Sequence, residues 1–589
     1  MRSVCSLRGS FDVRARGGVH NLPTELLSYV FELVTHALSQ DERNTLGTGQ
    51  RRLPFHPHSI RAPVPLSAVN RRWRRVALST PSLWTSIFVS VDNVVDCTIG
   101  DERNPSSFCG SKRLLDVESL AYFLLRSGNC TLDIFIDGRD PEWDFSDYLD
   151  GDGDDATDGR PSAQHPFDAQ IMTQILDILG HHVYRWRSVT VFSDTWAPLH
   201  AALCCLSVPR VGQGGFFNSR RGASCLETLK LMQCDEYNLR NEHFGSGAFK
   251  EPITTPFATL AGYPDGPSSL MLPARLRSIS LCGIHVNWSD FTRFISSTWG
   301  GLSNGIENLE LSYHHRDVRP DVTAFRQILE GCANLRSLIL KHSGPQWVGR
   351  APQGPSVLLP RLETLHLVFD NAEEAALTMS TLRCPGLKAL ILEDDTEAQY
   401  SPNDASLLLI YCGTGALRTP PRPGDDSTYD SLTCLPHSEM RSNVPPFPSV
   451  QDLTLEYVSA SCLVPYALLF AGLPNLRHLA LRHIPKYAFG SLLPQPFFCD
   501  WESASDIRTP LPCARLESIE ATHTEGAVYS ILGSTLRERA KLGAPRIPEV
   551  MLRLEGGHCS VPGPTELAYE EITCLDLAKT SERDAEYFN

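Results

Sequence analysis

The sequence lacks the long apolar runs and the leader pattern that place a chain in or across a membrane. No stretch of about 18 or more consecutive apolar residues occurs, so no transmembrane helix is expected. The N-terminus, Met1-Arg-Ser-Val-Cys-Ser-Leu-Arg8, contains no apolar block of roughly 7–15 residues, which a secretory signal peptide requires. We therefore expect an intracellular protein, cytoplasmic or nuclear, without a membrane partner.

The sequence also lacks a cysteine pattern that indicates disulfides. The 18 cysteines are scattered over the chain, no Cys-x-x-Cys occurs, and the adjacent Cys204 and Cys205 cannot readily form a disulfide with each other. Several others lie beside apolar runs, where a reduced cysteine packs as a small hydrophobic residue: Cys225, Cys282, Cys332 and Cys384. This usage is typical of a reducing compartment.

Basic charge is scarce. The chain has 53 Lys and Arg against 68 Asp and Glu, and its formal net charge is −15. Nucleic-acid binding requires a basic footprint, so no nucleic-acid partner is expected. The tightest basic cluster is the run at 71–75, with four arginines. We interpret it as the solvated face of a helix rather than as a phosphate site.

Motifs for catalysis and metal binding are few. Neither His-Glu-x-x-His nor Gly-x-x-x-x-Gly-Lys-[Ser/Thr] occurs. The pairs His181-His182 and His314-His315 consist of adjacent residues, which point in different directions and so are poorly placed to bind one metal. We therefore expect no catalytic residue, cofactor or metal in this chain.

An acidic run at 147–158 resembles a calcium-binding loop only in part. If the loop starts at Asp150, its sixth position is Asp155, where the sharp turn needs glycine. Its twelfth position is Pro161, where the ion needs a glutamate. A solvated acidic loop is the favoured interpretation.

Two segments near the N-terminus carry a more specific pattern. Asn21-Leu-Pro-Thr-Glu-Leu-Leu-Ser-Tyr-Val-Phe-Glu-Leu-Val34 predicts a helix from about Leu22 to Leu38, with Pro23 in its first turn. The stretch 63–84 predicts one amphipathic helix between flanking prolines, and its apolar face is formed by Leu66, Val69, Trp73, Val76 and Ala77. Because a single helix of this length is marginal in water, the two helices are expected to pack together.

Read in order, Leu22-Pro23-x-Glu25-Leu26-Leu27-x-x-Val30-Phe31, Val69-x-x-x-Trp73-x-x-x-Ala77 and Pro81-x-Leu83-Trp84 resemble the F-box motif, in the variant abundant in large fungal F-box families. In that family the helices dock on a Skp-family adaptor through apolar residues. The adaptor-binding residues that the resemblance implies are Leu22, Pro23, Leu26, Leu27, Val30, Phe31, Val69 and Trp73, with Ala77 as a further candidate. For Val69 and Trp73 the alternative that they only seal the helical core stays open.

Downstream of the motif, helix and strand patterns alternate. We expect strands at 83–91, 132–136 and 186–191, and helices at 114–125 and 168–183. From residue 226 the hexamer Leu-x-x-Leu-x-Leu recurs, with Ile, Val or Ala at some positions. It starts at Leu226, Leu276, Ile306, Leu335, Leu362, Leu387, Val450 and Leu476, and weaker copies lie at Leu516 and near Val550. Plausible helices fill the gaps at 320–332, 373–382, 463–473 and 526–542.

The spacing of the hexamer resembles that of leucine-rich repeats. The starts at 276, 306, 335, 362 and 387 lie 30, 29, 27 and 25 residues apart, at or just above the range of about 20–29 residues for that family. The Asn or Cys that regular repeats carry eight residues after the first leucine is present only as Cys234. We therefore expect an α/β fold: a small helical F-box followed by an irregular leucine-rich-repeat solenoid with a strand plus helix per repeat.

The expected organisation has five parts. They are a disordered N-terminus (1–18), an F-box domain (19–85) with an insertion at 39–62, the solenoid (86–560), disordered insertions near 147–166 and 418–448, and a C-terminal tail (561–589). Leu83 and Trp84 are expected at the hinge into the solenoid. Residues between the strand leucines are expected on the concave face: Thr228, Lys230, Met232, Asn308, Glu310, Ser312, Thr364, His366, Val368, His478, Ala480 and Arg482.

Taken together, the two resemblances imply a non-catalytic substrate receptor of a Skp–cullin–F-box ubiquitin ligase. The F-box would bind the Skp-family adaptor, and through it a cullin-RING ligase, while the repeats hold an unknown target protein. The alternative is a repeat-type interaction scaffold whose degenerate F-box no longer binds an adaptor, and the insertion at 39–62 favours it. A third class, an enzyme on an α/β repeat, would require a pocket with convergent polar groups.

Overall fold

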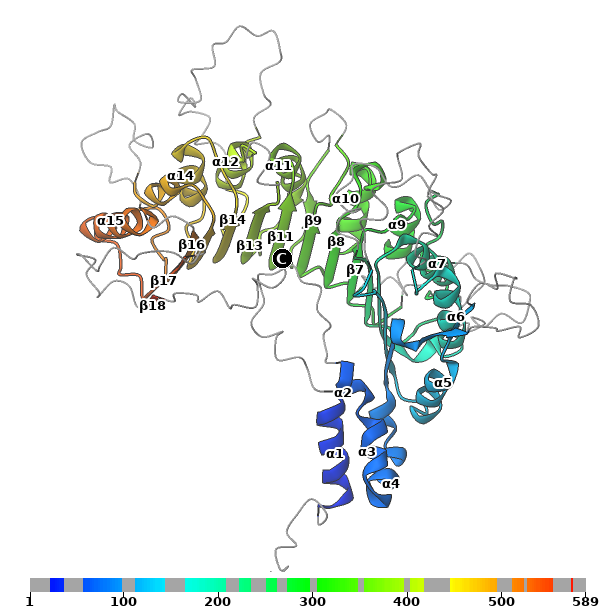
Figure 1. Cartoon of the computed structure of the whole chain (residues 1–589). Coiled ribbons are helices and arrows are strands. Elements are labelled where there is room, and N and C mark those ends of the chain that lie inside the picture. Colours follow the sequence, from blue (N-terminus) through cyan, green and yellow to red (C-terminus); the bar gives the residue numbers. More distant parts are fainter. Residues whose placement is uncertain are drawn as a thin grey trace, which may run out of the picture. The chain divides into compact units, whose positions relative to one another are not determined.

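The computed structural model describes residues 22–36, 57–97, 112–143, 165–207, 222–234, 251–261, 273–296, 305–347, 354–396, 403–417, 445–494, 511–523, 527–554 and 574–575 (Figure 1). The predicted disordered N-terminus, most of the predicted insertions and nearly all of the predicted tail lie outside these residues. Contacts divide the chain into unit 1, residues 1–202 with 223–226, and unit 2, residues 203–222 with 227–589. The predicted hinge at Leu83 and Trp84 lies inside unit 1.

Unit 1 begins with a group of helices. They are α1 (Thr24–Thr35), α2 (Pro57–Arg61), α3 (Pro63–Val69), α4 (Arg71–Ser79) and the 3-10 helix η3 (Pro81–Trp84). Leu27, Phe31, Val76, Ala77, Leu83 and Trp84 form its buried core. The Nε1 of Trp84 donates to the carbonyl of Ala77 at 2.8 Å, which ties η3 to α4. The expected packing of the two motif segments is therefore confirmed.

The prediction of a single helix within 63–84 is wrong in one respect. The structure has two helices, because Asn70 is extended (φ −160°, ψ 174°) and separates α3 from α4. The Asn70 side chain accepts a hydrogen bond from the backbone N–H of Trp73 at 2.9 Å and so caps α4. An asparagine in this position competes with helix continuation, and the 3.6-residue apolar period does not register that competition.

The rest of unit 1 is a small α/β layer. Strands β1 (Ser86–Ser90), β4 (Leu132–Gly138) and β5 (Trp186–Ser193) are parallel neighbours, and β2 (Val94–Cys97) pairs antiparallel with β3 (Lys112–Leu115). Helices α5 (Val117–Arg126) and α6 (Ala169–Gly180) and the 3-10 helices η4 (Val91–Asn93) and η6 (Val183–Arg185) complete it. The strand expected at 83–91 begins only at Ser86. The helix expected at 114–125 begins only at Val117, because Leu114 belongs to β3 and pairs with Val95.

Unit 2 contains a large parallel sheet whose strands follow chain order (Figure 1). The strands are β6 (Thr228–Gln233), β7 (Ser278–Cys282), β8 (Asn308–Ser312), β9 (Ser337–Lys341), β11 (Thr364–Phe369), β13 (Ala389–Asp394), β14 (Asp452–Glu456), β15 (His478–Arg482), β16 (Ser518–His523), β17 (Glu549–Leu554) and β18 (Cys574–Leu575). Short strands β10 (Val357–Leu358) and β12 (Leu382–Arg383) form a separate parallel pair. Each predicted hexamer therefore contributes one parallel strand, as expected.

Helices lie in many of the connections between successive strands of this sheet, although none of the described residues between β9 and β11 is helical. They are α9 (Trp288–Ser296), α10 (Val322–Gly331), α11 (Ala372–Ser380), α12 (Ser406–Thr414), α14 (Leu463–Ala471) and α15 (Ala527–Lys541), with the 3-10 helices η7 (Arg316–Val318) and η9 (Lys486–Leu492). Helix α7 (Trp196–Ser207) spans the division between the units. The four helices expected in the gaps correspond to α10, α11, α14 and α15.

The register explains why the hexamer repeats. The fourth residues of successive hexamers are aligned across the sheet, as in the pairs Leu309↔Leu338 and Leu453↔Leu479, and each is at most 1% exposed. The sixth residues form a second buried row, which includes Leu340. Because side chains alternate along a strand, both rows point to the helix-covered side, and the intervening residues point away. The leucines are thus the core of unit 2.

Candidate protein-binding surfaces

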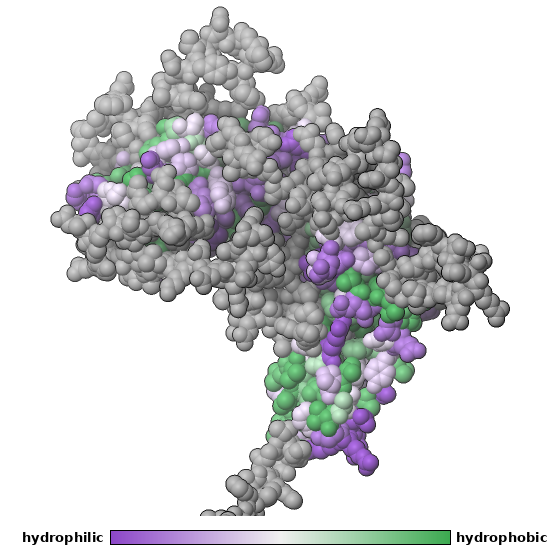
Figure 2. Space-filling model, viewed as in Figure 1, coloured by the Kyte–Doolittle hydropathy of each residue, from purple (hydrophilic) through white to green (hydrophobic). Residues whose placement is uncertain are grey.

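Helix α1 presents apolar residues on two sides. Leu27, Phe31 and Thr35, spaced by one helical turn, are at most 1% exposed and face the core of unit 1. Its other apolar residues are largely exposed: Leu26, Tyr29, Val30, Leu33 and Val34, at 51, 57, 41, 57 and 45%. We call these five residues the α1 apolar surface. In Figure 2 hydrophobic residues are visible over the described helices of unit 1, where Figure 1 places α1.

The helix is held firmly in this orientation. The rings of Phe31 and Trp73 lie 5.0 Å apart at 60°, and Trp73 packs half-buried against the core. At the start of α1 the carbonyl of Pro23 accepts from the N–H of Leu27, at 3.0 Å. The Arg72 guanidinium donates to the carbonyl of Leu22. The basic run is therefore not solely a solvated face, because Arg72 fixes the chain where α1 begins.

The structure divides the eight residues expected at the adaptor interface. Pro23, Leu26, Val30 and Val69 are exposed, and Leu22 and Trp73 are half-buried. Leu27 and Phe31 are buried and contribute to the core. Three further residues of α1 are exposed beside Leu26 and Val30 but were not among the expected residues: Tyr29, Leu33 and Val34. The width of the apolar face in 22–34 is the sequence signal that could have included them.

Such a surface needs an explanation. Scattered exposed apolar residues are ordinary, but five large ones on a helix of 12 residues form a contiguous patch. Val64 and Val69 on α3, a helix that contacts α1, are 49 and 57% exposed. Patches of this kind are typical of protein interaction sites.

The side of the unit 2 sheet that points away from the helices is polar and partly ordered by ion pairs. His366 Nε2 lies 3.3 Å from a carboxylate oxygen of Glu393. Arg482 lies between Glu456 and Glu520, at 3.2 and 3.5 Å. Burial raises the pKa of Glu456, and the neighbouring Glu393 carboxylate raises it further. Charged side chains of both signs occur on this face, so it is suited to a partner that also carries both signs of charge.

Not all residues expected on this face are exposed. Met232, Ser312 and Val368 are 6, 1 and 3% exposed. They lie at or next to the last residues of their strands. The residues at the strand centres, such as Lys230, Glu310 and His366, are half-buried and remain partly accessible.

The carboxyl edge of the same sheet carries an unusual backbone feature. Tyr313, His342, Tyr457 and His483 each follow a strand with a positive φ, between 44 and 55°. Each donates its N–H to the last part of the next strand, at 2.6–2.9 Å. Their rings stack in two pairs: Tyr313 with His342, 5.4 Å apart, and Tyr457 with His483, 4.5 Å apart. A positive φ at a residue other than glycine costs free energy of folding. The hydrogen bonds that repeat along this edge offset that cost.

A buried imidazole near this edge makes stability depend on pH. Burial, together with the charges of Arg319, His315 and His285, lowers the pKa of His314 to about 3. The Nδ1 of His314 lies 2.8 Å from the Ser343 hydroxyl. In the unfolded chain the same imidazole titrates near 6.5. Below that pH the unfolded state binds a proton that the folded state excludes, so folding stability is lost as the pH falls.

We therefore predict a pH-dependent difference between wild type and His314→Gln. From pH 7 to pH 5, His314 should account for a loss of about 2 kcal/mol in the free energy of unfolding of the wild type. Urea unfolding at both pH values measures it. The variant is less stable at pH 7 but should lose less on acidification. An equal loss in both proteins would show that His314 is not held neutral by burial.

Among the described residues no group of three or more His, Cys, Asp or Glu is placed to hold a metal ion. Burial raises the pKa of Cys384, Cys412 and Cys513 to about 12, so these thiols are poor nucleophiles at neutral pH. The calcium-like run at 147–158 lies outside the described residues. In the part of the chain that is described, no helix is long and apolar enough to cross a membrane.

One hydrolase-like pentapeptide, Gly-Leu-Ser-Asn-Gly at 301–305, does occur in the sequence. A nucleophile elbow requires a strand before the serine and a helix after it. Here helix α9 precedes the pentapeptide and strand β8 follows it, which is the reverse order. Ser303 itself lies outside the described residues.

Comparison of the sequence with protein-family models and with curated proteins finds no match to either. The assignment of a function therefore depends on the surfaces described above.

Proposed function

We propose that this protein is a substrate receptor of a Skp–cullin–F-box ubiquitin ligase. In this proposal the α1 apolar surface docks on a Skp-family adaptor, and the polar side of the unit 2 sheet holds the target protein. The chain itself makes or breaks no bond. It raises the effective concentration of a target lysine near the ubiquitin-conjugating enzyme.

One observation carries the proposal. Helix α1, which directly follows the Leu-Pro opening of the F-box-like motif, leaves five large apolar side chains in solvent, while Leu27 and Phe31 anchor it from behind. A helix fixed from one side and apolar on the other is suited to helix-in-groove recognition. The resemblance of the strand hexamers to leucine-rich repeats supports the second half of the proposal, since stacked repeats typically provide extended binding faces.

The exposed subset of residues defines the proposed contact. Leu26 and Val30 lie one turn apart on the α1 apolar surface, and Tyr29 and Leu33 continue it. Leu27, Phe31 and Trp73 support the surface from the core. A partner would therefore contact α1 directly. Helix α4 would affect binding only through its packing behind α1.

Co-expression of the full chain with a Skp-family adaptor, followed by size-exclusion chromatography with mass measurement, tests the proposal. We expect a 1:1 complex that survives dilution to micromolar concentration. If the full chain elutes alone beside unbound adaptor, the ligase proposal fails. The alternative, an interaction scaffold with a degenerate F-box, would then be favoured.

A further inference from the structure

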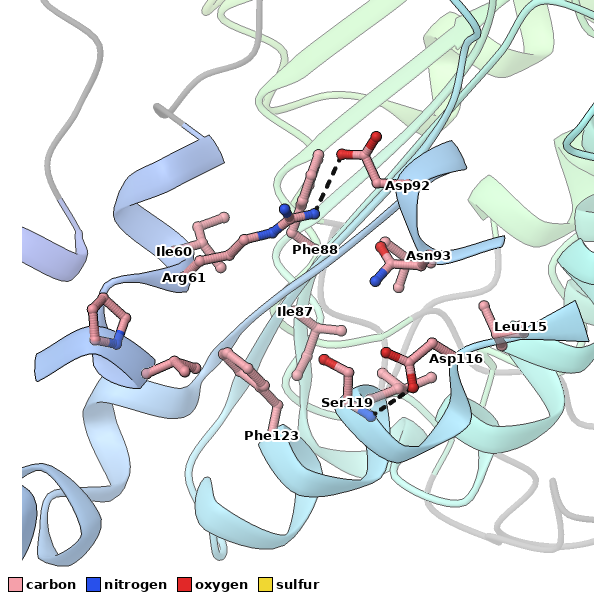
Figure 3. Close-up of a pocket in the computed structure, with 14 residues that line it drawn as sticks. Ile60, Arg61, Ile87, Phe88, Asp92, Asn93, Leu115, Asp116, Ser119 and Phe123 are labelled. Atoms are coloured by element: carbon pink, nitrogen blue, oxygen red, sulfur yellow. Dashed lines mark hydrogen bonds and ion pairs between the residues drawn. The ribbon is translucent and has the colours of Figure 1, made fainter. Parts of the chain in front are cut away.

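Unit 1 contains a pocket that the proposed function does not use. It has a volume of about 390 Å³ and lies between helices α2 and α3 on one side and β1 and α5 on the other (Figure 3). This volume is within the range of small-ligand and side-chain binding pockets. None of its lining residues belongs to the α1 apolar surface.

The floor of the pocket is apolar. Ile60, Ile87, Leu115 and Leu120 line it and are only 2–7% exposed, so they are fixed by packing on their other sides. Figure 3 shows Ile87, on β1, and Phe123, on α5, lining the same pocket. An apolar group of suitable size would remove this lining from water, which is favourable in proportion to the area covered.

The charged groups at the pocket are two carboxylates and one guanidinium. Arg61 lies 3.5 Å from Asp92, and both side chains are substantially exposed, at 47 and 70%. An exposed pair of this kind contributes little and can exchange partners. One carboxylate oxygen of Asp116 accepts the N–H of Ser119 at 3.3 Å. The lining therefore carries an excess of one negative charge, which favours a cation and disfavours phosphate.

Two further polar groups face the same space. Asn93 Oδ1 accepts the N–H of Ser90 at 3.0 Å, which fixes the amide and leaves its Nδ2 as a donor at the pocket. The Ser119 hydroxyl lies across from it on α5 (Figure 3). An amide donor and a hydroxyl are suitable partners for a peptide carbonyl.

We propose that this pocket binds an extended segment of a partner protein in which a bulky apolar side chain is followed by lysine or arginine. The apolar side chain lies on Ile87 and Leu120, the cationic group pairs with Asp116 and Asp92, and a backbone carbonyl of the segment accepts from Asn93. This proposal is independent of adaptor binding by α1.

Blocked tetrapeptides test the proposal on the full chain. The probes are acetyl-Ala-Phe-Lys-Ala-amide, acetyl-Ala-Phe-Glu-Ala-amide and acetyl-Ala-Ala-Lys-Ala-amide, and binding is followed by saturation-transfer difference NMR. The Phe-Lys probe should bind with a Kd on the order of 1 mM. The Phe-Glu and Ala-Lys probes should each bind about tenfold more weakly, since each lacks one of the two anchors.

Two variants separate the pocket from the surrounding surface. Ser119→Trp fills the pocket from an exposed position of α5 and should weaken the Phe-Lys probe at least about tenfold without lowering Tm. Glu118→Trp adds the same side chain at an exposed neighbour that does not line the pocket, and it should leave binding unchanged. Equal binding of all three probes, or unchanged binding to Ser119→Trp, overturns the proposal. Binding of phenethylamine but of no peptide also overturns it, because the site would then take a small amine.

Discussion

The double substitution Leu26→Asp/Val30→Asp is expected to weaken binding to a Skp-family adaptor about 100-fold or more. Both side chains lie on the α1 apolar surface, 51 and 41% exposed. Burying two carboxylates in an apolar interface replaces two favourable contacts by desolvation of charge. Loss of two central contacts typically costs at least about 2 kcal/mol each, and 1.4 kcal/mol corresponds to a factor of ten in Kd. Isothermal titration calorimetry on the full chain measures the change.

Two controls make this result specific. Leu125→Asp introduces one carboxylate at an exposed apolar residue of α5, 75% exposed, and should leave the affinity unchanged. The double variant itself should unfold at nearly the wild-type urea concentration, because surface substitutions usually change stability by no more than about 0.5 kcal/mol. An adaptor affinity equal to that of wild type would remove α1 from the proposed interface.

Trp84→Ala is expected to lower the free energy of unfolding of unit 1 by about 3–5 kcal/mol. Trp84 is fully buried, and its ring lies 5.3 and 5.1 Å from the rings of Tyr122 and Phe123 in edge-on geometry. Removal of the indole leaves a cavity among these rings and deprives the Ala77 carbonyl of its donor. Hydrogen exchange of α1, α4 and η3 measures the effect locally.

The matched variant Trp84→Phe keeps most of the ring but not the N–H donor. It should cost clearly less than Trp84→Ala, because the aromatic contacts with α5 remain. If Trp84→Ala leaves exchange in α4 at the wild-type rate, then Trp84 does not join the helices to the small α/β layer of unit 1. That result would favour the expectation that Leu83 and Trp84 form a hinge.

The strands of unit 2 were predictable from sequence because each depends on one local pattern. In Leu362-Glu-Thr-Leu-His-Leu367 the alternation of apolar and other residues specifies a strand and the face that is buried. Helix α12 was not predicted for the opposite reason. Its residues from Leu408 to Gly413 are all buried, so its sequence shows no contrast between faces. A helix that is apolar all round gives no helical period.

The candidate site was only partly predictable. The motif located α1 and its partner segment, but both sides of α1 are apolar, and composition does not show which side is packed. Contact with Trp73 and Trp84 decides this by burying Phe31 and Leu27. Similarly, the break at Asn70 depends on one side-chain hydrogen bond to the backbone of Trp73, which the spacing of apolar residues does not reveal.

Hydrogen–deuterium exchange of the full chain, with and without a Skp-family adaptor, tests the central claim most directly. The proposal predicts that the adaptor slows exchange in α1, residues Thr24–Thr35, and in the segments that support it from Pro63 to Trp84. It predicts no change in the exchange rates of the strands from β6 to β16, because in this proposal they bind the target protein and not the adaptor. Unchanged exchange in α1 in the presence of saturating adaptor, or protection confined to unit 2, would contradict the proposal.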